Sequence, residues 1–151
     1  MAAVEVDNRS SQPVDGARLI AEADFTIDRL GLHPDVELSI SLVDPAEMTA
    51  LHVRWMDLPG VTDVLSFPMD ELRVPEPGHA AEPGMLGDVV ICPQVAAEQG
   101  EQAGHGRDAE LELLLTHGIL HLLGHDHAEP EEHAVMFGLQ DDLLAAWRGR
   151  G

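Results

Sequence analysis

The chain has 151 residues, with 28 Asp and Glu against 8 Lys and Arg, which gives a formal net charge of -20 at pH 7. Such a chain repels polyanions at long range, which excludes a general binder of free nucleic acid unless arginines cluster locally or a partner supplies positive charge. The length suits one domain over residues 1–151 with a substantial core, and no apolar run is long enough to cross a membrane.

The beginning of the sequence and its cysteine content fit the cytoplasm. Residues 1–7 lack the basic and apolar segments of a signal peptide. The one cysteine, Cys92, cannot form an internal disulfide, as expected in a reducing compartment. Because Cys92 follows an apolar run, we expect a small buried side chain there and not a fourth metal ligand.

The first third of the chain alternates strand and helix patterns. Residues 4–7 are a short strand candidate, and residues 13–30 have apolar side chains at helical spacing that ends at Gly31, a natural C-cap. Residues 37–43 alternate polar and apolar side chains, which is typical of a strand with one buried face. A helix is then predicted from Asp44 to about Trp55.

The start of that helix carries a capping signature. Asp44 is expected as the N-cap, Pro45 as the first helical residue, and Glu47 as the residue that completes a capping box. Residues 62–67 form the next predicted strand, which Pro68 should end.

The second half predicts a loop, a buried strand and three helices. Residues 70–83 are rich in Pro, Glu, Gly and Ala and should form an exposed loop, whereas 87–92 is nearly all apolar and should be a central strand buried on both faces. Pro93 opens a short helix. Residues 109–123 predict a helix that is apolar on most sides, and a last helix should run from about residue 129 to Trp147.

Strands and helices in this order predict an α+β fold with α/β character. We expect a single mixed β-sheet of about four strands packed with helices, in which the helix over 109–123 is central. It would lie between the sheet and the other helices.

The segment 117–127, with the sequence HGILHLLGHDH, predicts a metal site. On a helix, His117 and His121 lie one above the other and can offer two imidazoles to one ion. Gly124 can take the left-handed conformation that ends a helix, so the chain could fold back and bring His127 to a third corner. Three protein ligands with a fourth position for water describe a catalytic zinc site. We therefore predict one zinc ion per chain, held by His117, His121 and His127.

The ligand spacing is that of the extended zincin motif, H-E-x-x-H-x-x-G-x-x-H. Here Gly118 replaces the glutamate that serves metalloproteases as general base, so no catalytic residue is assigned. Asp126 could orient an imidazole, accept a proton from the metal-bound water, or only shape the turn. The turn should point His125 away from the pocket. The other histidines should be exposed or half-buried and should not bind metal: His33, His52, His79, His105 and His133.

Three segments of the chain resemble the YbeY family of bacterial endoribonucleases, or rRNA maturation factors. They are TDVLSFP at 62–68, LGDVVICP at 86–93, and the stretch from Glu112 through the motif at 117–127, in the family's order and spacing. The resemblance covers nearly the whole chain. It implies a metal-dependent nuclease with His117, His121 and His127 as zinc ligands.

The same resemblance implies a role for the protein. It would cleave single-stranded RNA, mature the 3′ end of small-subunit rRNA and act in ribosome quality control. Its partners would be ribosomal RNA and the ribosome or ribosomal proteins, with no membrane and no DNA expected. Many family members carry an arginine, thought to face the RNA, six residues before the Thr of the TDVLSF segment. Here that residue is Met56, and Arg54 would lie on a different helix face. RNA contact is therefore rearranged, or a partner supplies it.

Three hypotheses of function follow. The first is a zinc-dependent endoribonuclease. The second is a metalloprotease-like hydrolase, which the ligand spacing favours and Gly118 weakens. The third is a non-catalytic ribosome-assembly factor with a structural metal, which the net charge of -20 and the missing arginine favour. The sequence leaves open whether water or the 2′-hydroxyl of the RNA would attack the phosphodiester.

Overall fold

A computed structural model describes residues 2–56, 62–125 and 128–150 of the chain. No helix within those ranges is both long enough and apolar enough to cross a bilayer. The predicted ligand His127 and its neighbour Asp126 lie outside the described residues.

The described part of the chain forms a four-stranded sheet with the order β1-β2-β4-β3. Strands β1 (Ala3–Asn8), β2 (Glu37–Leu42) and β4 (Met85–Ile91) are parallel, and β3 (Val64–Pro68) runs antiparallel to β4 at one edge. The prediction of one mixed sheet of about four strands is confirmed. Pro68 is the last residue of β3, where a proline is tolerated because the strand lies at the edge.

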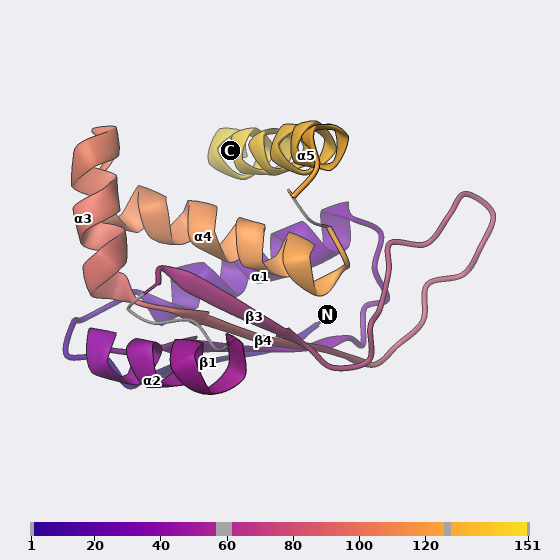
Figure 1. Ribbon diagram of the computed structural model, residues 1–151. Helices are drawn as coiled ribbons and strands as arrows, with labels where there is room; N and C mark the ends of the chain where they lie inside the picture. Colours follow the sequence, from indigo (N-terminus) through magenta and orange to yellow (C-terminus); the bar gives the residue numbers. More distant parts are fainter. Residues whose placement is uncertain (1, 57–61, 126–127, 151) are drawn as a thin grey trace.

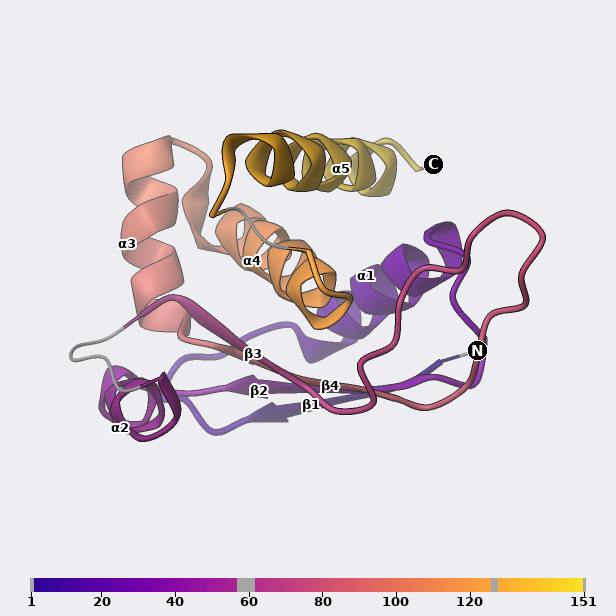
Figure 2. The same ribbon diagram turned by 45° about the vertical axis from the view of Figure 1, so that its right-hand side comes forward.

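Five helices of the described ranges surround this sheet in layers. Helices α1 (Gly16–Arg29) and α4 (Gly106–Leu122) lie on one face, and α2 (Pro45–Met56) lies on the other (Figures 1 and 2). Helix α5 (Pro130–Gly149) packs on the outer side of α4, and α3 (Pro93–Ala103) packs against α4 near its start. Helix α4 therefore lies between the sheet and α5, as the sequence predicted for the metal-binding helix.

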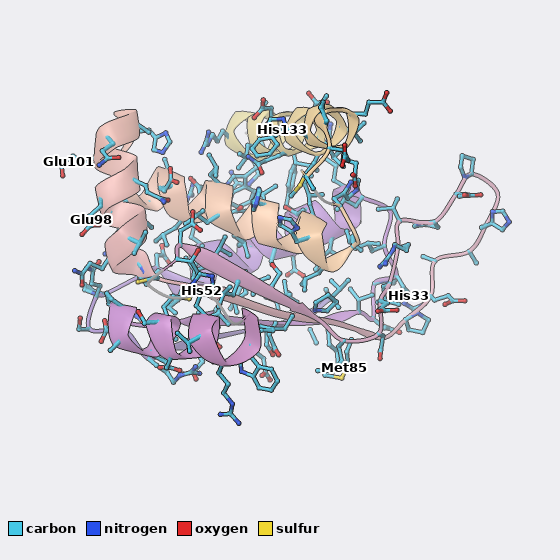
Figure 3. The ribbon with its side chains drawn as sticks, in the orientation of Figure 1. His33, His52, Met85, Glu98, Glu101 and His133 are labelled. Atoms are coloured by element: carbon cyan, nitrogen blue, oxygen red, sulfur yellow. The ribbon has the colours of Figure 1, made fainter. Side chains whose placement is uncertain are left out.

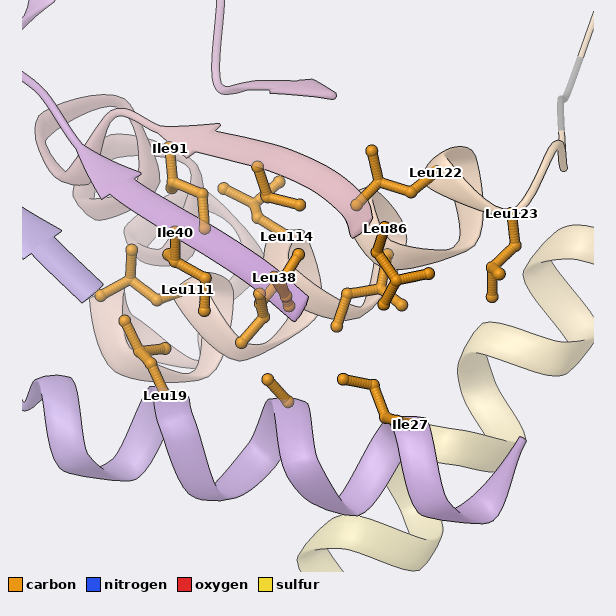
Figure 4. Packing of buried hydrophobic residues seen from close by; sticks show 14 of the residues in the cluster. Leu19, Ile27, Leu38, Ile40, Leu86, Ile91, Leu111, Leu114, Leu122 and Leu123 are labelled. Atoms are coloured by element: carbon orange, nitrogen blue, oxygen red, sulfur yellow. The ribbon is translucent and has the colours of Figure 1, made fainter. Parts of the chain in front are cut away.

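The core lies between the sheet and the layer of α1 and α4. Strand β2 alternates as predicted, so that Leu38, Ile40 and Leu42 point into this core while Ser39 and Ser41 are half-buried. Strand β4 is buried on both faces, with Val89 at 0% and Val90 at 5% exposure, as expected of a central strand. Figure 4 shows side chains of both strands meeting those of α1 and α4, among them Leu19, Ile27, Leu111 and Leu114.

Cys92 is fully buried at the end of β4, as predicted, in a smaller cluster under α2 with Val43, Met48, Leu65 and Val90. This cluster attaches α2 to the other face of the sheet. Burial raises the pKa of the Cys92 thiol, so the side chain behaves as a small apolar group.

Two helix starts differ from the sequence prediction. Helix α1 begins at Gly16 and not at residue 13, because the Asp15 side chain accepts a hydrogen bond from the Arg18 backbone N–H at 3.2 Å and so acts as the N-cap. Helix α4 begins at Gly106, three residues before the predicted start at 109.

The capping box predicted for α2 is wrong, because the side chains of Asp44 and Glu47 bind residues outside the helix. The Asp44 carboxylate accepts hydrogen bonds from the Ser11 N–H at 2.9 Å and the Ser11 hydroxyl at 3.0 Å. Glu47 forms an ion pair with Arg9 at 2.6 Å. Both carboxylates thus attach the segment that follows β1 to the start of α2. Asp44 contributes to the helix through its backbone, because its carbonyl accepts a hydrogen bond from the Met48 N–H.

Candidate metal centre

Helix α4 brings two of the predicted ligands together. The Nε2 atoms of His117 and His121 lie 3.1 Å apart, and their rings meet edge to face with centroids 4.6 Å apart. Two imidazole nitrogens bound to one tetrahedral zinc at about 2.0–2.1 Å would be separated by about 3.3 Å. The two rings therefore already converge at the spacing that a shared ion of this size requires.

Gln140 of α5 holds the orientation of the first ring. Its side-chain oxygen lies 2.8 Å from Nδ1 of His117, and Gln140 is only 2% exposed. Because an amide oxygen only accepts hydrogen bonds, Nδ1 of His117 is the donor in this contact, and in the neutral imidazole Nε2 then carries the lone pair. A partner of this kind fixes the tautomer and direction of a metal-binding histidine. Phe137 of α5 packs against the same ring, with centroids 5.6 Å apart.

Gly124 ends α4 as predicted. Its φ of 93° is in the left-handed region. The Gly124 N–H donates to the His121 carbonyl at 3.0 Å, and the His125 N–H donates to the Leu120 carbonyl at 3.1 Å. These two bonds are those of a Schellman motif, which satisfies the last carbonyls of a helix and reverses the chain direction. The turn therefore redirects the chain immediately before residues 126 and 127.

The donor set among the described residues is incomplete. Over residues 2–56, 62–125 and 128–150, no group of three His, Cys, Asp or Glu side chains is arranged to hold a metal ion. The predicted third ligand, His127, is outside those ranges, as is Asp126. His125 is half-buried and lines a different hollow on the surface, together with Gly124, Glu131 and Glu132.

The two histidines open into a cavity along the edge strand. This cavity, of about 330 Å³, is lined by residues 62–66 together with His117 and His121. Because β3 lies at the edge of the sheet, the cavity is bounded on one side by an edge strand and on the other by α4. A substrate can therefore reach the histidine pair from the open edge of the sheet.

Gly118 lets α4 approach the sheet closely enough to form this cavity. A Cβ atom at this position would lie 2.7 Å from Cγ1 of Val89 and 3.3 Å from Oγ of Ser66. Ser66 donates its hydroxyl hydrogen to the Gly118 carbonyl at 3.0 Å. Residue 118 is therefore a close-packed position, and its glycine carries no side chain that could act as a zincin-type general base.

A buried polar cluster fixes the other side of α4. Thr116 donates its hydroxyl hydrogen to Glu22 of α1 at 2.8 Å, and Glu112 accepts hydrogen bonds from Arg18 at 3.2 Å and from the Trp147 indole N–H. Burial raises the pKa of Glu22 well above its ordinary value, so this carboxyl favours its neutral form. Glu112 thus connects α4 to α1 and α5, and Thr116, the residue before His117, connects α4 to α1.

Sequence reasoning missed two residues near the site, Gln140 and Arg73. Gln140 is 23 positions from His117, and nothing local connects them. For Ser66, Phe67, Gly87 and Asp88 the sequence left a site role and ordinary strand packing or turn geometry equally open, and the structure places the Ser66 hydroxyl against the Gly118 carbonyl beside His117. Arg73 has its guanidinium against Gly124, where an added Cβ would lie 2.7 Å from its Cζ atom. Its charge stands at the C-terminal end of α4, where a helix dipole favours a cation.

The histidines that were not predicted as ligands are exposed or half-buried, as expected. Figure 3 shows three of them on separate parts of the molecule: His52 on α2, His133 on α5, and His33 between α1 and β2. His133 stacks on Phe137 with ring centroids 4.2 Å apart.

The chain is similar to known proteins in its sequence and in its fold. The family model described as "Endoribonuclease YbeY" matches residues 5–148. A protein named Endoribonuclease YbeY from Thermobifida fusca is 61% identical over 145 residues, which cover 96% of this chain and 94% of that one. A relative of the same name from a Nocardioides species is 58% identical over 147 residues, covering 97% and 99%. The solution structure of TM1509 from Thermotoga maritima shares the fold, with a TM-score of 0.65 at 23% identity over 99% of this chain and 90% of that one.

Proposed function

The chain belongs to the Endoribonuclease YbeY family, and we propose that it is a metal-dependent endoribonuclease that acts on ribosomal RNA. Its relatives carry the name of an RNA-cleaving enzyme over nearly the full length of the chain. The observation that carries the proposal is the pair of Nε2 atoms 3.1 Å apart, opening into a cavity at the sheet edge.

The proposed metal is one zinc ion per chain, with His117, His121 and His127 as its ligands. The Nε2 spacing and the Gln140 contact on Nδ1 of His117 both support a site for a cation that binds neutral imidazoles. Such a cation, when bound, acts as a Lewis acid toward a phosphoryl oxygen or toward water. His117 and His121 hold it at the edge of the cavity, while Gln140 keeps the His117 proton on the nitrogen that faces away.

The proposed substrate is single-stranded RNA in small-subunit rRNA maturation and ribosome quality control. The partners are ribosomal RNA and the ribosome or ribosomal proteins, in the cytoplasm, with the chain acting as one domain over residues 1–151. The net charge of -20 is compatible with an enzyme that meets its RNA within a larger particle, since a partner can then supply the positive surface.

The protease hypothesis is disfavoured by one specific contact. The residue that would be the general base is Gly118, and its position is packed against Val89. The assembly-factor hypothesis makes a different prediction, namely that rRNA processing continues without the metal.

The test uses purified protein loaded with zinc. Labelled single-stranded RNA, a matched duplex and casein are incubated with the wild type and with His117→Ala and His121→Ala, and bound metal is measured before and after chelation. We expect cleavage of single-stranded RNA only, lost on chelation and restored by zinc, with both variants metal-poor and inactive. Hydrolysis of casein, or RNA cleavage that survives the loss of metal, would contradict the proposal.

Two further readouts sharpen the test. A 2′,3′-cyclic phosphate on the products would indicate attack by the RNA 2′-hydroxyl, whereas a 5′-phosphate with a free 3′-hydroxyl would indicate attack by water. In cells, a His117→Ala variant that loses metal yet still supports rRNA processing would favour the assembly factor over the enzyme.

A further inference from the structure

Trp55 is a large aromatic side chain exposed at the last turn of α2. It is 59% exposed, whereas the other tryptophan of the chain, Trp147, is 2% exposed. The chain contains only two Trp, three Phe and no Tyr, so an aromatic ring left in solvent is unusual for this composition. The Arg54 guanidinium lies 5.2 Å from the Trp55 ring centroid, and Phe67 of β3 meets the indole edge to face at 6.3 Å.

The indole forms one wall of a groove on the face of the sheet that carries α2. This groove has a volume of about 420 Å³, with Phe67 and Val90 among its apolar residues and Arg9, Ser41 and Asp88 among its polar ones. The pairing of the strands explains why these residues lie together in the groove. Phe67 of β3 pairs with Asp88 of β4, and Ser41 of β2 pairs with Val90 of β4. Paired residues of neighbouring strands point to the same face.

The charge of the groove indicates what kind of group it would accept. Arg9 is already neutralised by Glu47 at 2.6 Å and by Asp7 at 2.9 Å, and the Asp88 carboxylate adds negative charge. A phosphate would be repelled here. A neutral, flat group that carries hydrogen-bond donors on its edge suits an aromatic wall beside a carboxylate, and a nucleobase with an amino group has these properties.

The groove and the metal cavity share the edge strand β3. Successive side chains of a strand point to opposite faces. Ser66 points to α4, where it bonds to the Gly118 carbonyl beside His117, and Phe67 therefore points to the groove. A single strand of RNA that crosses the edge of the sheet at β3 can place a phosphate in the cavity and a base against Trp55.

We propose that Trp55 and its groove bind one unpaired base of the RNA substrate, a few nucleotides from the scissile phosphate. The base stacks on the indole, and the Asp88 carboxylate accepts a hydrogen bond from an amino group on the base edge. Stacking on an aromatic side chain requires an unpaired base, so the groove would select single-stranded over duplex RNA. This inference rests on the proposed function, since it assigns a subsite for the same RNA.

The test compares Trp55→Ala with two controls. Trp55→Phe keeps an aromatic face, and Val53→Ala removes another exposed apolar side chain of α2, 49% exposed, that does not line the groove. Binding of an unstructured labelled oligonucleotide is measured by anisotropy on chelated protein, and KM and kcat are measured on zinc-loaded protein. Trp55→Ala should weaken binding and raise KM by about 5- to 150-fold with kcat nearly unchanged. Trp55→Phe should recover most of this loss, and Val53→Ala should match the wild type.

Two more measurements separate stacking from a structural role. RNA should quench the tryptophan fluorescence of the wild type but not of Trp55→Phe, because Trp147 is buried and cannot meet a base. A thermal melt of each variant verifies that folding is intact.

The outcomes distinguish this inference from the proposed function. If the wild type neither binds nor cleaves RNA, the proposed function fails and the subsite fails with it. If the wild type cleaves RNA and Trp55→Ala matches it in KM and binding, only the subsite is overturned. If Trp55→Ala binds RNA normally but loses association with a protein partner, the groove is a protein interface and the inference is likewise overturned.

Discussion

Replacing Gly118 by alanine tests how closely α4 packs against the sheet beside His117. Glycine in the middle of a helix normally costs about 1 kcal/mol relative to alanine, so this substitution would stabilise an unconstrained helix. Here the new Cβ would lie 2.7 Å from Cγ1 of Val89, whereas carbon atoms pack best at about 3.5–4.0 Å. Val89 is fully buried and β-branched, so it has little freedom to move. Overpacking of this kind costs about 1–3 kcal/mol.

Gly138 of α5 is the matched control, because an added Cβ there meets no atom within 4 Å. Gly138→Ala should raise the free energy of unfolding by about 0.5–1 kcal/mol through helix propensity alone. The free energy of unfolding of Gly118→Ala should be lower than that of Gly138→Ala by about 1–3 kcal/mol, which is the cost of overpacking. For a domain of this size the two melting temperatures should then differ by roughly 2–12 °C.

A second substitution isolates the steric contact. Val89→Ala alone should cost about 2 kcal/mol or more from lost burial and a cavity. It also removes the atom that Gly118→Ala meets, so the double variant should be less destabilised than the sum of the two single variants, by about 1–3 kcal/mol. Urea denaturation of all four proteins measures this coupling. Strict additivity, or a Gly118→Ala variant as stabilised as Gly138→Ala, would refute the close-packing argument.

Three other predictions concern the site and its charges. Gln140→Leu should reduce zinc affinity by about 10- to 100-fold without unfolding the protein. Competition with a chromophoric chelator measures this affinity. An unchanged affinity would show that Gln140 does not position His117. Burial raises the folded-state pKa of Glu22, so its stabilising contribution is complete below the unfolded value of about 4.3 and is lost as pH rises through the folded pKa. The free energy of unfolding of Glu22→Gln relative to that of the wild type, measured by urea denaturation, should therefore rise from about pH 4 toward pH 8. If this difference between the two proteins stays constant with pH, the raised pKa of Glu22 is contradicted. Added salt should leave RNA affinity unchanged or raise it, because screening weakens the repulsion from a chain of net charge -20; a steep fall with salt would instead indicate several cation–phosphate contacts.

The sheet and most of the helices could be predicted from the sequence because each has a local periodic signal. Alternation in 37–43 identified β2, and the nearly unbroken apolar run of 87–92 identified β4 as a central strand. The predicted start of α1 was less accurate, since the N-cap is decided by one hydrogen bond from the Arg18 backbone N–H to the Asp15 carboxylate. The capping box at α2 was wrong because its carboxylates are used in tertiary contacts, which no local pattern reveals.

The histidine pair could also be predicted, because positions four apart on a helix always share a face. The tautomer of His117 could not, since Gln140 reaches it from another helix. Gly118 was noted in the sequence only as the absence of a protease glutamate. Its packing against Val89 shows that the glycine has a structural reason of its own. The assignment of His117, His121 and His127 as metal ligands stays a prediction, and His127 lies outside the described residues.

The edge strand β3 relates these features to one another. One face of β3 bounds the cavity of His117 and His121, and the other contributes Phe67 to the groove of Trp55. The protein-side groups assigned to substrate or metal here are imidazoles, an indole and the Asp88 carboxylate, and none of them is an arginine or a lysine. A chain with 28 acidic and 8 basic residues has few cations to offer a polyanion, and three of its arginines are already ion-paired with carboxylates. Recognition by a metal ion and by base stacking requires little protein positive charge. The acidic composition and an RNA substrate are then compatible, provided that the ion supplies the charge that the arginines do not.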